Sequence, residues 1–404
     1  MARVVLRSAS WAGLSSRLRP GAGLSSRLRP RAAALSSGID PSRLTVELTD
    51  KPAAKPANES LKGMFGRYFT DHMLEIDWTA DEGWGAPRIA PYGPLALSPA
   101  AMCLHYALEC FEGMKCYRDG EGRLRLFRPD CNMERMNSSM ERLAMPAFDG
   151  DAFVACLKEL LRRDADWVPG GDGYSMYIRP TAIATDPFLG VGQASRVKLF
   201  AILSPVGPYY PEGFQPIRVY ADPHNVRAWP GGAGNTKLGS NYGPSITPQI
   251  AAARDHACQQ VLYLFGPEKR VTEVGAMNLF VLWRGADGAR ELVTAPLDEG
   301  DILPGVTRRS VLELARAWPD VDVVSERHFT IDELLEASRE GRVEEVFGAG
   351  TAAVVAPVKA IQYGDDAEIV VPTGESIGPI AQRVWDELLA IQYGKVEHPW
   401  SVLV

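Results

Sequence analysis

Lys237 is the residue whose surroundings most directly suggest covalent chemistry. It lies in WPGGAGNTKLGSNYG, residues 229–243, among glycines at positions 231, 232, 234, 239 and 243. A phosphate-binding P-loop is excluded, because that motif needs glycine before the lysine and serine or threonine after it. Thr236 and Leu238 occupy those places. A lysine that forms a Schiff base needs a lowered pKa and space for a flat ring. Because glycine lacks a Cβ atom, we expect these glycines to leave that space.

A pyridoxal cofactor makes three further demands: a carboxylate for its pyridine nitrogen, a donor for its phenolic oxygen and a cup for its phosphate. Tyr242 lies five residues after the lysine and can act as the donor. Glu273 precedes an apolar run and could place its carboxylate at the start of that strand. ILPGVTRRS is a turn into a helix that exposes amides at 306–307, and FGAGTAAV predicts a glycine turn ending at Thr351. From spacing alone, an exposed loop lysine is the alternative.

The elements that must position these residues are mixed. Strands are predicted for RLRLFRP, KLFAILSPV, IRVYA, QVLYLF and NLFVLW. Helices are predicted for DAFVACLKELLRRDADW behind an aspartate cap, GVTRRSVLELARAW, TIDELLEASREG and IAQRVWDELLAIQYG. In TIDELLEASREG, Thr330 and Glu333 form a capping box and Gly341 marks the stop. The fold class is therefore α/β or α+β.

Two domains are expected, because the chain has 404 residues and single cores stop growing near roughly 250–300 residues. SPVGPYYPEGF, residues 204–214, has the proline and glycine content of a linker. We predict a small N-terminal α/β domain over 39–203, a linker over 204–216 and a large C-terminal cofactor-binding domain over 217–404.

Residues 1–38 have a different composition, with seven arginines, no acidic residue and two copies of AGLSSRLRP. An Arg- and Ser-rich, acid-poor N-terminus is typical of an organelle transit peptide, and a disordered basic tail is the alternative. We predict a disordered mitochondrial transit peptide over 1–38, with cleavage near Leu35 to Gly38 and the mature protein in the matrix.

Several partners are disfavoured by composition. The formal net charge of −7 argues against nucleic acid, and no apolar run is long enough to span a membrane. The six cysteines form no Cys-x-x-Cys pair and indicate free or buried thiols. The six histidines are scattered without metal-ligand spacing, so no metal site is predicted.

Eight motifs together resemble those of the branched-chain amino acid aminotransferases, a group within the class IV pyridoxal-phosphate enzymes. They are FEGMKCYR, LRLFRPDCNMERM, YIRPTAI, LSPVGPYY, VRAWPGGAGNTKLGSNYG, TEVGAMNLFV, LPGVTRRSVLELA and VFGAGTAAVVAPV. The similarity runs from about Phe65 to the C-terminus and is greatest to the eukaryotic mitochondrial form. It implies a two-domain, fold-type IV homodimer with pyridoxal 5′-phosphate at the domain interface.

By this resemblance, Lys237 carries the Schiff base and moves the Cα proton of the substrate. Glu273 pairs with the pyridine nitrogen, and Tyr242 bonds the phenolic oxygen. The other implied cofactor contacts are Arg135, Leu303, Val306, Thr307 and Thr351. The implied substrate residues are Phe65, Tyr106, Phe111, Tyr177, Arg179, Leu189, Val191, Tyr209, Ala276, Met277 and Ala352.

Some of these substrate residues have more specific implied roles. Tyr106, Tyr177 and Arg179 are the candidates for the second carboxylate of glutamate. Leu189 and Val191 would reach into the partner subunit's pocket, and residue 209, a tyrosine in the linker, would close the pocket.

The implied activity is ping-pong amino transfer between L-leucine, L-isoleucine or L-valine and 2-oxoglutarate, giving branched 2-oxo acids and L-glutamate. The alternatives are a D-amino acid transaminase or an aminodeoxychorismate lyase of the same fold, or a catalytically silent cofactor-binding scaffold. Two positions depart from many relatives. Ala353 and Ala356 replace a Cys-x-x-Cys pair, which excludes redox control there. Ala276 replaces a threonine and removes a hydroxyl near the cofactor.

Overall fold

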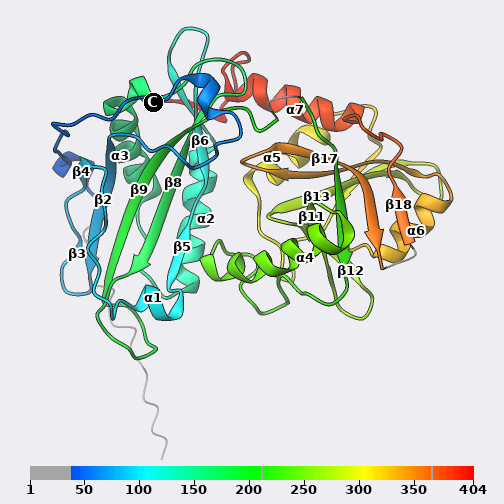
Figure 1. Cartoon of the computed structure of the whole chain (residues 1–404), viewed down its shortest axis with the longest axis horizontal. Coiled ribbons are helices and arrows are strands. Elements are labelled where there is room, and N and C mark those ends of the chain that lie inside the picture. Colours follow the sequence, from blue (N-terminus) through cyan, green and yellow to red (C-terminus); the bar gives the residue numbers. More distant parts are fainter. Residues whose placement is uncertain (1–37, 211–212, 365–366) are drawn as a thin grey trace, which may run out of the picture. The chain divides into compact units, whose positions relative to one another are not determined.

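A computed structural model describes residues 38–210, 213–364 and 367–404 (Figure 1). The predicted transit peptide, 1–38, lies outside the described residues except for Gly38. The described strands form two separate sheets, with helices packed beside each of them. The predicted mixed α/β class is therefore confirmed.

The first sheet has the strand order β1-β4-β2-β9-β8-β6-β7-β19, with β3 beside β2 and β5 beside β8. Its strands are β1 (Thr45–Val46), β2 (His72–Thr79), β3 (Gly83–Trp84), β4 (Arg88–Pro91), β5 (Glu109–Phe111), β6 (Met114–Arg118), β7 (Leu124–Phe127), β8 (Ser175–Ala184), β9 (Arg196–Val206) and β19 (Ser401–Leu403). Every pairing in it is antiparallel except β1 with β4. Strand β9 continues three residues past 203, the predicted end of the first domain. The C-terminal strand β19 pairs with β7 of this sheet, although its residues fall in the predicted second domain.

The second sheet has the order β12-β11-β10-β17-β16-β13-β14-β15, with β18 beside β17. Its strands are β10 (Ile217–Asp222), β11 (Gln260–Phe265), β12 (Arg270–Val274), β13 (Met277–Arg284), β14 (Arg290–Thr294), β15 (Val323–Glu326), β16 (Val343–Gly350), β17 (Val354–Tyr363) and β18 (Ala367–Val370). Parallel pairs such as β10–β11 alternate with antiparallel hairpins such as β16–β17. The five predicted strands all lie in β7, β9, β10, β11 and β13.

The predicted helices are also present. The α-helices are α1 (Met102–Tyr106), α2 (Pro129–Arg142), α3 (Gly150–Arg163), α4 (Ile246–His256), α5 (Val306–Ala315), α6 (Ile331–Arg339) and α7 (Pro379–Gln392). The 3₁₀ turns are η1 (Pro41–Arg43), η2 (Asn58–Leu61), η3 (Ala165–Trp167), η4 (Gly239–Asn241) and η5 (Gly243–Ser245). The Asp149 carboxylate caps α3, and the capping box of Thr330 and Glu333 opens α6 as predicted.

Apolar side chains from both sheets meet in a shared core. Tyr117 and Phe127 of the first sheet pack in one cluster with Phe280 of the second, and α5 and α7 contribute Val311 and Val384. Separate clusters lie under α2 and α3 at the first sheet and under α6 at the second. The shared cluster fixes one sheet against the other, so side chains from both can line common cavities.

Candidate active site

Lys237 is held by backbone contacts on both sides. Its amide donates to Ser139 Oγ on α2 at 2.9 Å, and its carbonyl accepts from the amide of Phe111 on β5 at 3.0 Å. The Nζ atom donates to the Tyr242 hydroxyl at 2.9 Å and lies 4.7 Å from the centre of the Phe111 ring. The loop that carries the lysine is thereby fixed against the first sheet, and Tyr242 sets the direction of its amine.

Gly239, two residues after Lys237, packs against the first sheet. A Cβ atom at Gly239 would overlap the Glu109 carboxylate, so this glycine permits the loop to pack closely on β5. The expectation that these glycines make room for a ring is therefore wrong for Gly239. The glycines that line the cavity beside Lys237 are Gly305 and Gly350, which lie elsewhere in the sequence.

The pKa of Lys237 is lowered to about 8, first by burial and then by the positive charge of Arg135. The negative charge of Glu112 opposes the shift. A lysine with its usual pKa is almost entirely protonated at neutral pH, whereas a pKa near 8 leaves about a tenth of the amine neutral at pH 7. Lys237 can therefore act as a nucleophile and a proton acceptor under physiological conditions.

The apoprotein is expected to attach pyridoxal phosphate faster as the pH rises toward 8, because only the neutral amine of Lys237 reacts with an aldehyde. Above about pH 9 the rate should level off, since the amine is then fully neutral. Stopped-flow visible absorbance at a series of pH values measures this rate. A rate that keeps rising beyond about pH 10 would show that Lys237 has the pKa of an exposed lysine.

Glu273 is a buried carboxylate on the same cavity. It lies within β12, not at the start of the next strand as predicted, because residues 270–274 pair with β11. Its Oε1 accepts from Asn278 Nδ2 at 2.9 Å, and Asn278 also donates to the Leu303 carbonyl at 3.0 Å. Arg227 Nη1 lies 2.5 Å from Oε2, yet neither atom has a hydrogen bond of good geometry among the described residues. Burial raises the pKa of Glu273 although Arg227 opposes it.

The start of α5 provides an anion-binding surface. The helix begins at Val306 after Gly305, which has no side chain to cap it. Its first amides therefore remain available, and a helix N-terminus favours negative charge. Thr307 and Thr351 line the same cavity as these residues and as Lys237 and Glu273.

The glycine turn predicted for FGAGTAAV is wrong in its position. Residues 347–350 continue strand β16, and the turn comprises 351–353. Thr351 consequently begins the turn instead of ending it. The register of β16 and β17, which places Gly350 opposite Val354, forces this tight three-residue connection.

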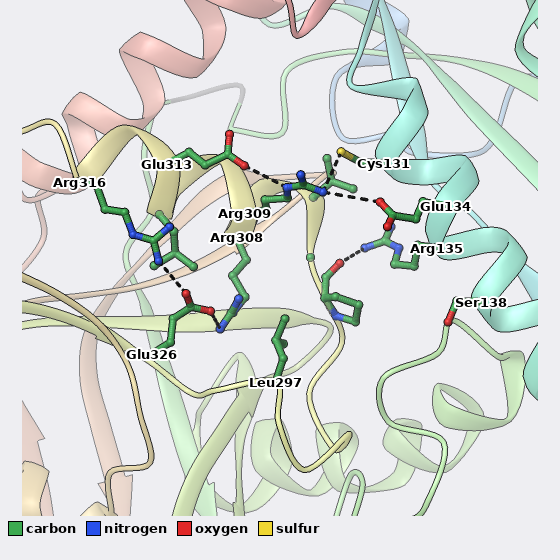
Figure 2. Close-up of a pocket in the computed structure, with 14 residues that line it drawn as sticks. Cys131, Glu134, Arg135, Ser138, Leu297, Arg308, Arg309, Glu313, Arg316 and Glu326 are labelled. Carbon is green, nitrogen blue, oxygen red and sulfur yellow. Dashed lines mark hydrogen bonds and ion pairs between the residues drawn. The ribbon is translucent and has the colours of Figure 1, made fainter. Parts of the chain in front are cut away.

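Arg135 joins the cavity beside Lys237 to a buried carboxylate. Its Nε and Nη2 atoms donate to the two oxygens of Glu112 at 2.7 and 2.8 Å, and Nη1 donates to the Pro304 carbonyl at 3.0 Å. Figure 2 shows this last bond at the edge of a further cavity between α2 and α5, which also borders Gly305 and Val306. Three donor groups are engaged, and two N–H groups of the guanidinium remain for an anion.

Four of the predicted substrate residues form one continuous group. The Phe65 and Tyr177 rings are 4.8 Å apart at their centres. The Arg179 guanidinium lies 4.6 Å from the centre of the Phe111 ring and donates to the Tyr177 hydroxyl at 2.9 Å. A Cβ atom at Gly113 would overlap that hydroxyl, so glycine is required there. The group begins at Phe111, beside the Lys237 amine, and continues through Arg179 and Tyr177 to Phe65.

The remaining substrate candidates fall into two groups. Tyr209, Ala276, Met277 and Ala352 line a neighbouring cavity with Thr351. Tyr106, Leu189 and Val191 lie on the exposed surface instead, and the Tyr106 hydroxyl donates to the Leu189 carbonyl. Val191 is 81% exposed and Leu189 is 62% exposed, so two large apolar side chains lie next to each other on the surface of this chain.

Sequence reasoning missed four charged or polar groups: Glu112, Arg227, Asn278 and Lys115. A signal existed for Glu112 and Lys115, because both lie in FEGMK, an apolar and glycine-containing segment where a charge needs a partner. No comparable signal marks Arg227 or Asn278, whose importance depends on their distance from Glu273.

Metal and membrane functions gain no support from the described part of the chain. Within it, no group of three or more metal-binding side chains is close enough to hold an ion. None of its helices is both long and apolar enough to cross a membrane. All six cysteines are free thiols, and five of them are buried.

Comparison with known proteins places this chain in one family. The family model for amino-transferase class IV matches residues 109–361. The branched-chain-amino-acid aminotransferase of Monosiga brevicollis is 51% identical over 374 residues, covering 92% of this chain and 94% of its own. The mitochondrial branched-chain-amino-acid aminotransferase of Bos taurus is 49% identical over 370 residues, covering 91% and 93%. Relatives named cytosolic, such as that of Ovis aries, also match at 49% identity, over 84% of this chain and 88% of their own length.

A solved structure agrees with these relatives. The branched-chain amino acid aminotransferase of Escherichia coli aligns at a TM-score of 0.64 and 25% identity, over 81% of this chain and 98% of that chain. The chain belongs to the class IV aminotransferases and, within them, to the branched-chain-amino-acid aminotransferases. The family, the fold type and the pyridoxal-phosphate cofactor that the motifs implied are thereby confirmed.

Proposed function

We propose that this protein is a pyridoxal-phosphate-dependent transaminase that moves an amino group reversibly between branched-chain L-amino acids and 2-oxoglutarate. The observation that carries the proposal is the contact between Lys237 Nζ and the Tyr242 hydroxyl, on a cavity that also holds the buried Glu273 carboxylate. A scaffold without catalysis would have no need to lower the pKa of a buried lysine or to bury a carboxylate beside it.

The cavity offers each group that the cofactor requires. Pyridoxal phosphate, when bound, supplies a protonated ring that accepts the electron pair left on the substrate's Cα atom. Glu273 Oε2, which lacks a well-aligned hydrogen bond among the described residues, keeps the pyridine nitrogen protonated. The Tyr242 hydroxyl would donate to the phenolic oxygen. The phosphate would be held at the uncapped start of α5, and the residues that would contact it are Arg135, Leu303, Val306, Thr307 and Thr351.

Lys237 performs the proton transfers. Its neutral Nζ would take the proton from the substrate's Cα atom and deliver it to C4′ of the cofactor, and the half-reaction with the 2-oxo acid would reverse this transfer. This is general acid–base catalysis by a group with a pKa close to the working pH. The Tyr242 hydroxyl keeps that amine oriented. The Phe111 ring, 4.7 Å from Nζ, covers it and limits the access of water.

The substrate pocket combines apolar walls with a few polar groups. Phe65, Phe111 and Met277 bury a branched side chain, and each methylene contributes about 1–3 kcal/mol of discrimination. Tyr209 closes the pocket from the linker. We propose that Leu189 and Val191 insert into the partner subunit's pocket in a homodimer, since burial there would explain their exposure in one chain.

The proposal also covers the domain organisation and the N-terminal segment. The two sheets would be the cores of a small N-terminal and a large C-terminal domain, joined through residues 204–216, of which 204–206 still belong to β9. The C-terminal strand β19 returns to the first sheet. Residues 1–38 direct import into the mitochondrial matrix, which is supported by their composition and by the mitochondrial relatives. A fusion of residues 1–38 to a fluorescent protein tests import directly.

The visible spectrum of residues 39–404, loaded with pyridoxal phosphate, tests the activity. L-Leucine should convert the bound pyridoxal band to the pyridoxamine form, and 2-oxoglutarate should restore it. A protein that stays colourless with added cofactor would refute the proposal. A response to D-alanine alone would favour the D-amino acid transaminase, and a stable band that responds to no amino acid would favour the scaffold.

A further inference from the structure

Ser139 is a polar residue on a fully buried side of helix α2. Its exposed fraction is 0%, and nearby Met136 and Met140 of the same helix are fully buried too. Serine is a weaker helix former than alanine, and a buried hydroxyl has to be satisfied by hydrogen bonds. A serine at this position therefore costs helix stability unless its hydroxyl has a specific task.

The Ser139 hydroxyl has two partners. It donates to the Arg135 carbonyl, one turn earlier in α2, at 2.9 Å, and it accepts from the Lys237 amide at 2.9 Å. The first bond fixes the hydroxyl against its own helix, as is common for serine inside a helix. The second bond joins this helix to the loop that carries the reacting amine. One oxygen thereby links the backbones of the two residues that we expect at opposite ends of the cofactor.

Helix α2 sets the spacing between these two residues. Arg135 and Ser139 lie on one face, because residues four apart in a helix are neighbours. A rise of about 1.5 Å per residue separates them by about 6 Å along the axis. The Arg135 guanidinium is itself held by Glu112 and by the Pro304 carbonyl near the start of α5. The helix therefore fixes the distance from the phosphate-binding end of the cavity to the loop of Lys237.

The contacts on the other side of this loop do not replace the bond to Ser139. The Lys237 carbonyl accepts from the Phe111 amide, and Gly239 packs on Glu109, so both contacts join the loop to β5. The Lys237 amide faces α2 instead. Without the hydroxyl, this amide would face a methyl group at a fully buried position, and the loop would shift until the amide found another partner.

We propose that Ser139 is a positioning residue that holds the Lys237 loop on α2, at the distance from Arg135 at which Nζ reaches the aldehyde of pyridoxal phosphate. This inference rests on the proposed transaminase function, which places the phosphate at Arg135 and the aldehyde at Lys237. Attachment joins Nζ to the aldehyde carbon through a C=N bond, and the aldehyde oxygen leaves as water. Ser139 takes no part in that step but keeps the amine where the step can occur.

Two ligands separate this role from general structural damage. In 4′-deoxypyridoxine 5′-phosphate a methyl group replaces the aldehyde, so this ligand has the ring and the phosphate but cannot bond to Nζ. Ser139→Ala, made in the full chain and freed of cofactor, should bind pyridoxal phosphate about tenfold more weakly, because the position that permits attachment leaves the Lys237 amide without a partner. Its affinity for the deoxy ligand should stay unchanged. Calorimetric titration measures both affinities.

Ser138→Ala is the matched control, because it makes the same change at the neighbouring position of the same helix. Ser138 is exposed and borders the cavity between α2 and α5 in Figure 2. Its side chain does not contact the Lys237 amide, which is bonded to Ser139. Both affinities of this variant should equal those of the wild type.

Double variants show whether the effect passes through the lysine. Lys237→Met cannot attach the aldehyde, so adding Ser139→Ala to it should cause no further loss of affinity for pyridoxal phosphate. Lys359→Met changes a lysine that pairs with Glu375 outside these cavities. In that background the full effect of Ser139→Ala should persist.

Other outcomes would overturn the inference. An equal loss of affinity for both ligands in Ser139→Ala would show that Ser139 only maintains the packing of α2. Unchanged affinities for both would show that the contacts with β5 are enough to place Lys237. The titrations do not depend on turnover. A wild-type enzyme that binds pyridoxal phosphate but has no leucine half-reaction would instead contradict the proposed function, so the two failures are distinguishable.

Discussion

Lys237→Met is expected to lower the rate of amino transfer by about 10²–10⁴-fold, the contribution typical of one positioned acid–base group. Methionine fills the volume of the lysine and keeps the contact with the Phe111 ring, but it has no amine to move the Cα proton. The backbone bonds of residue 237 to Ser139 and Phe111 do not involve the side chain, so the loop should stay in place. Leucine half-reaction rates measured by stopped-flow absorbance give the loss.

Small amines provide the control for this variant. If the missing group is a proton-transfer base, methylamine should partly restore the half-reaction of Lys237→Met, with a rate proportional to the amine concentration. Lys359→Met should retain the wild-type rate. A Lys237→Met protein that turns over leucine at more than about a tenth of the wild-type rate would refute the role of Lys237 as the acid–base group.

Local features of this fold were accessible from the sequence because they depend on neighbouring residues. The capping box of Thr330 and Glu333 acts within four residues, and the apolar periodicity of α5 and α7 requires no partner. The exposed amides at Val306 were predictable for the same reason, since a Pro-Gly turn before a helix leaves its first N–H groups free.

Features that depend on distant pairing were not accessible. The position of Glu273 within β12 is set by its antiparallel partner β11, and the turn at Thr351 is set by the register of β16 against β17. The glycine at 239 is explained by Glu109, which lies 130 positions earlier. Composition and spacing carry no information about such contacts, so the sequence supplied a wrong reason for that glycine.

The ion pairs of the site show the same limit. Glu112 and Arg135 are separated by 23 positions, and Arg227 and Glu273 by 46. Each pair is formed only when strands and loops from different parts of the chain come together. The resemblance to a family supplied the identities of Arg135 and Glu273, but it did not supply the partners that hold them.

Glu273→Gln is the second substitution with a large expected effect. The amide keeps the shape of the carboxylate and its bond from Asn278, but it lacks the negative charge that keeps the pyridine nitrogen protonated. We expect the leucine half-reaction to slow by about 10²–10³-fold, comparable to the loss of one group that stabilises charge in a transition state. The half-saturating leucine concentration should change little, since Glu273 does not contact the substrate in this arrangement.

The charge of Arg227 must be considered when this variant is measured. Its guanidinium is buried beside Glu273, and removing one partner of a buried ion pair typically costs about 3–5 kcal/mol of stability. Glu273→Gln should therefore melt at a lower temperature than the wild type. The double variant with Arg227→Met removes the unpaired charge and should recover part of the melting temperature.

Recovery of stability and recovery of rate separate the two roles of Glu273. The double variant has no carboxylate, so its leucine half-reaction should remain as slow as that of Glu273→Gln even when its melting temperature rises. If the rate rose together with the stability, Glu273 would act mainly by keeping Arg227 buried. A persistent slow rate in a stable protein would assign to Glu273 the charge that tunes the cofactor, because no other carboxylate of the described residues lines that cavity.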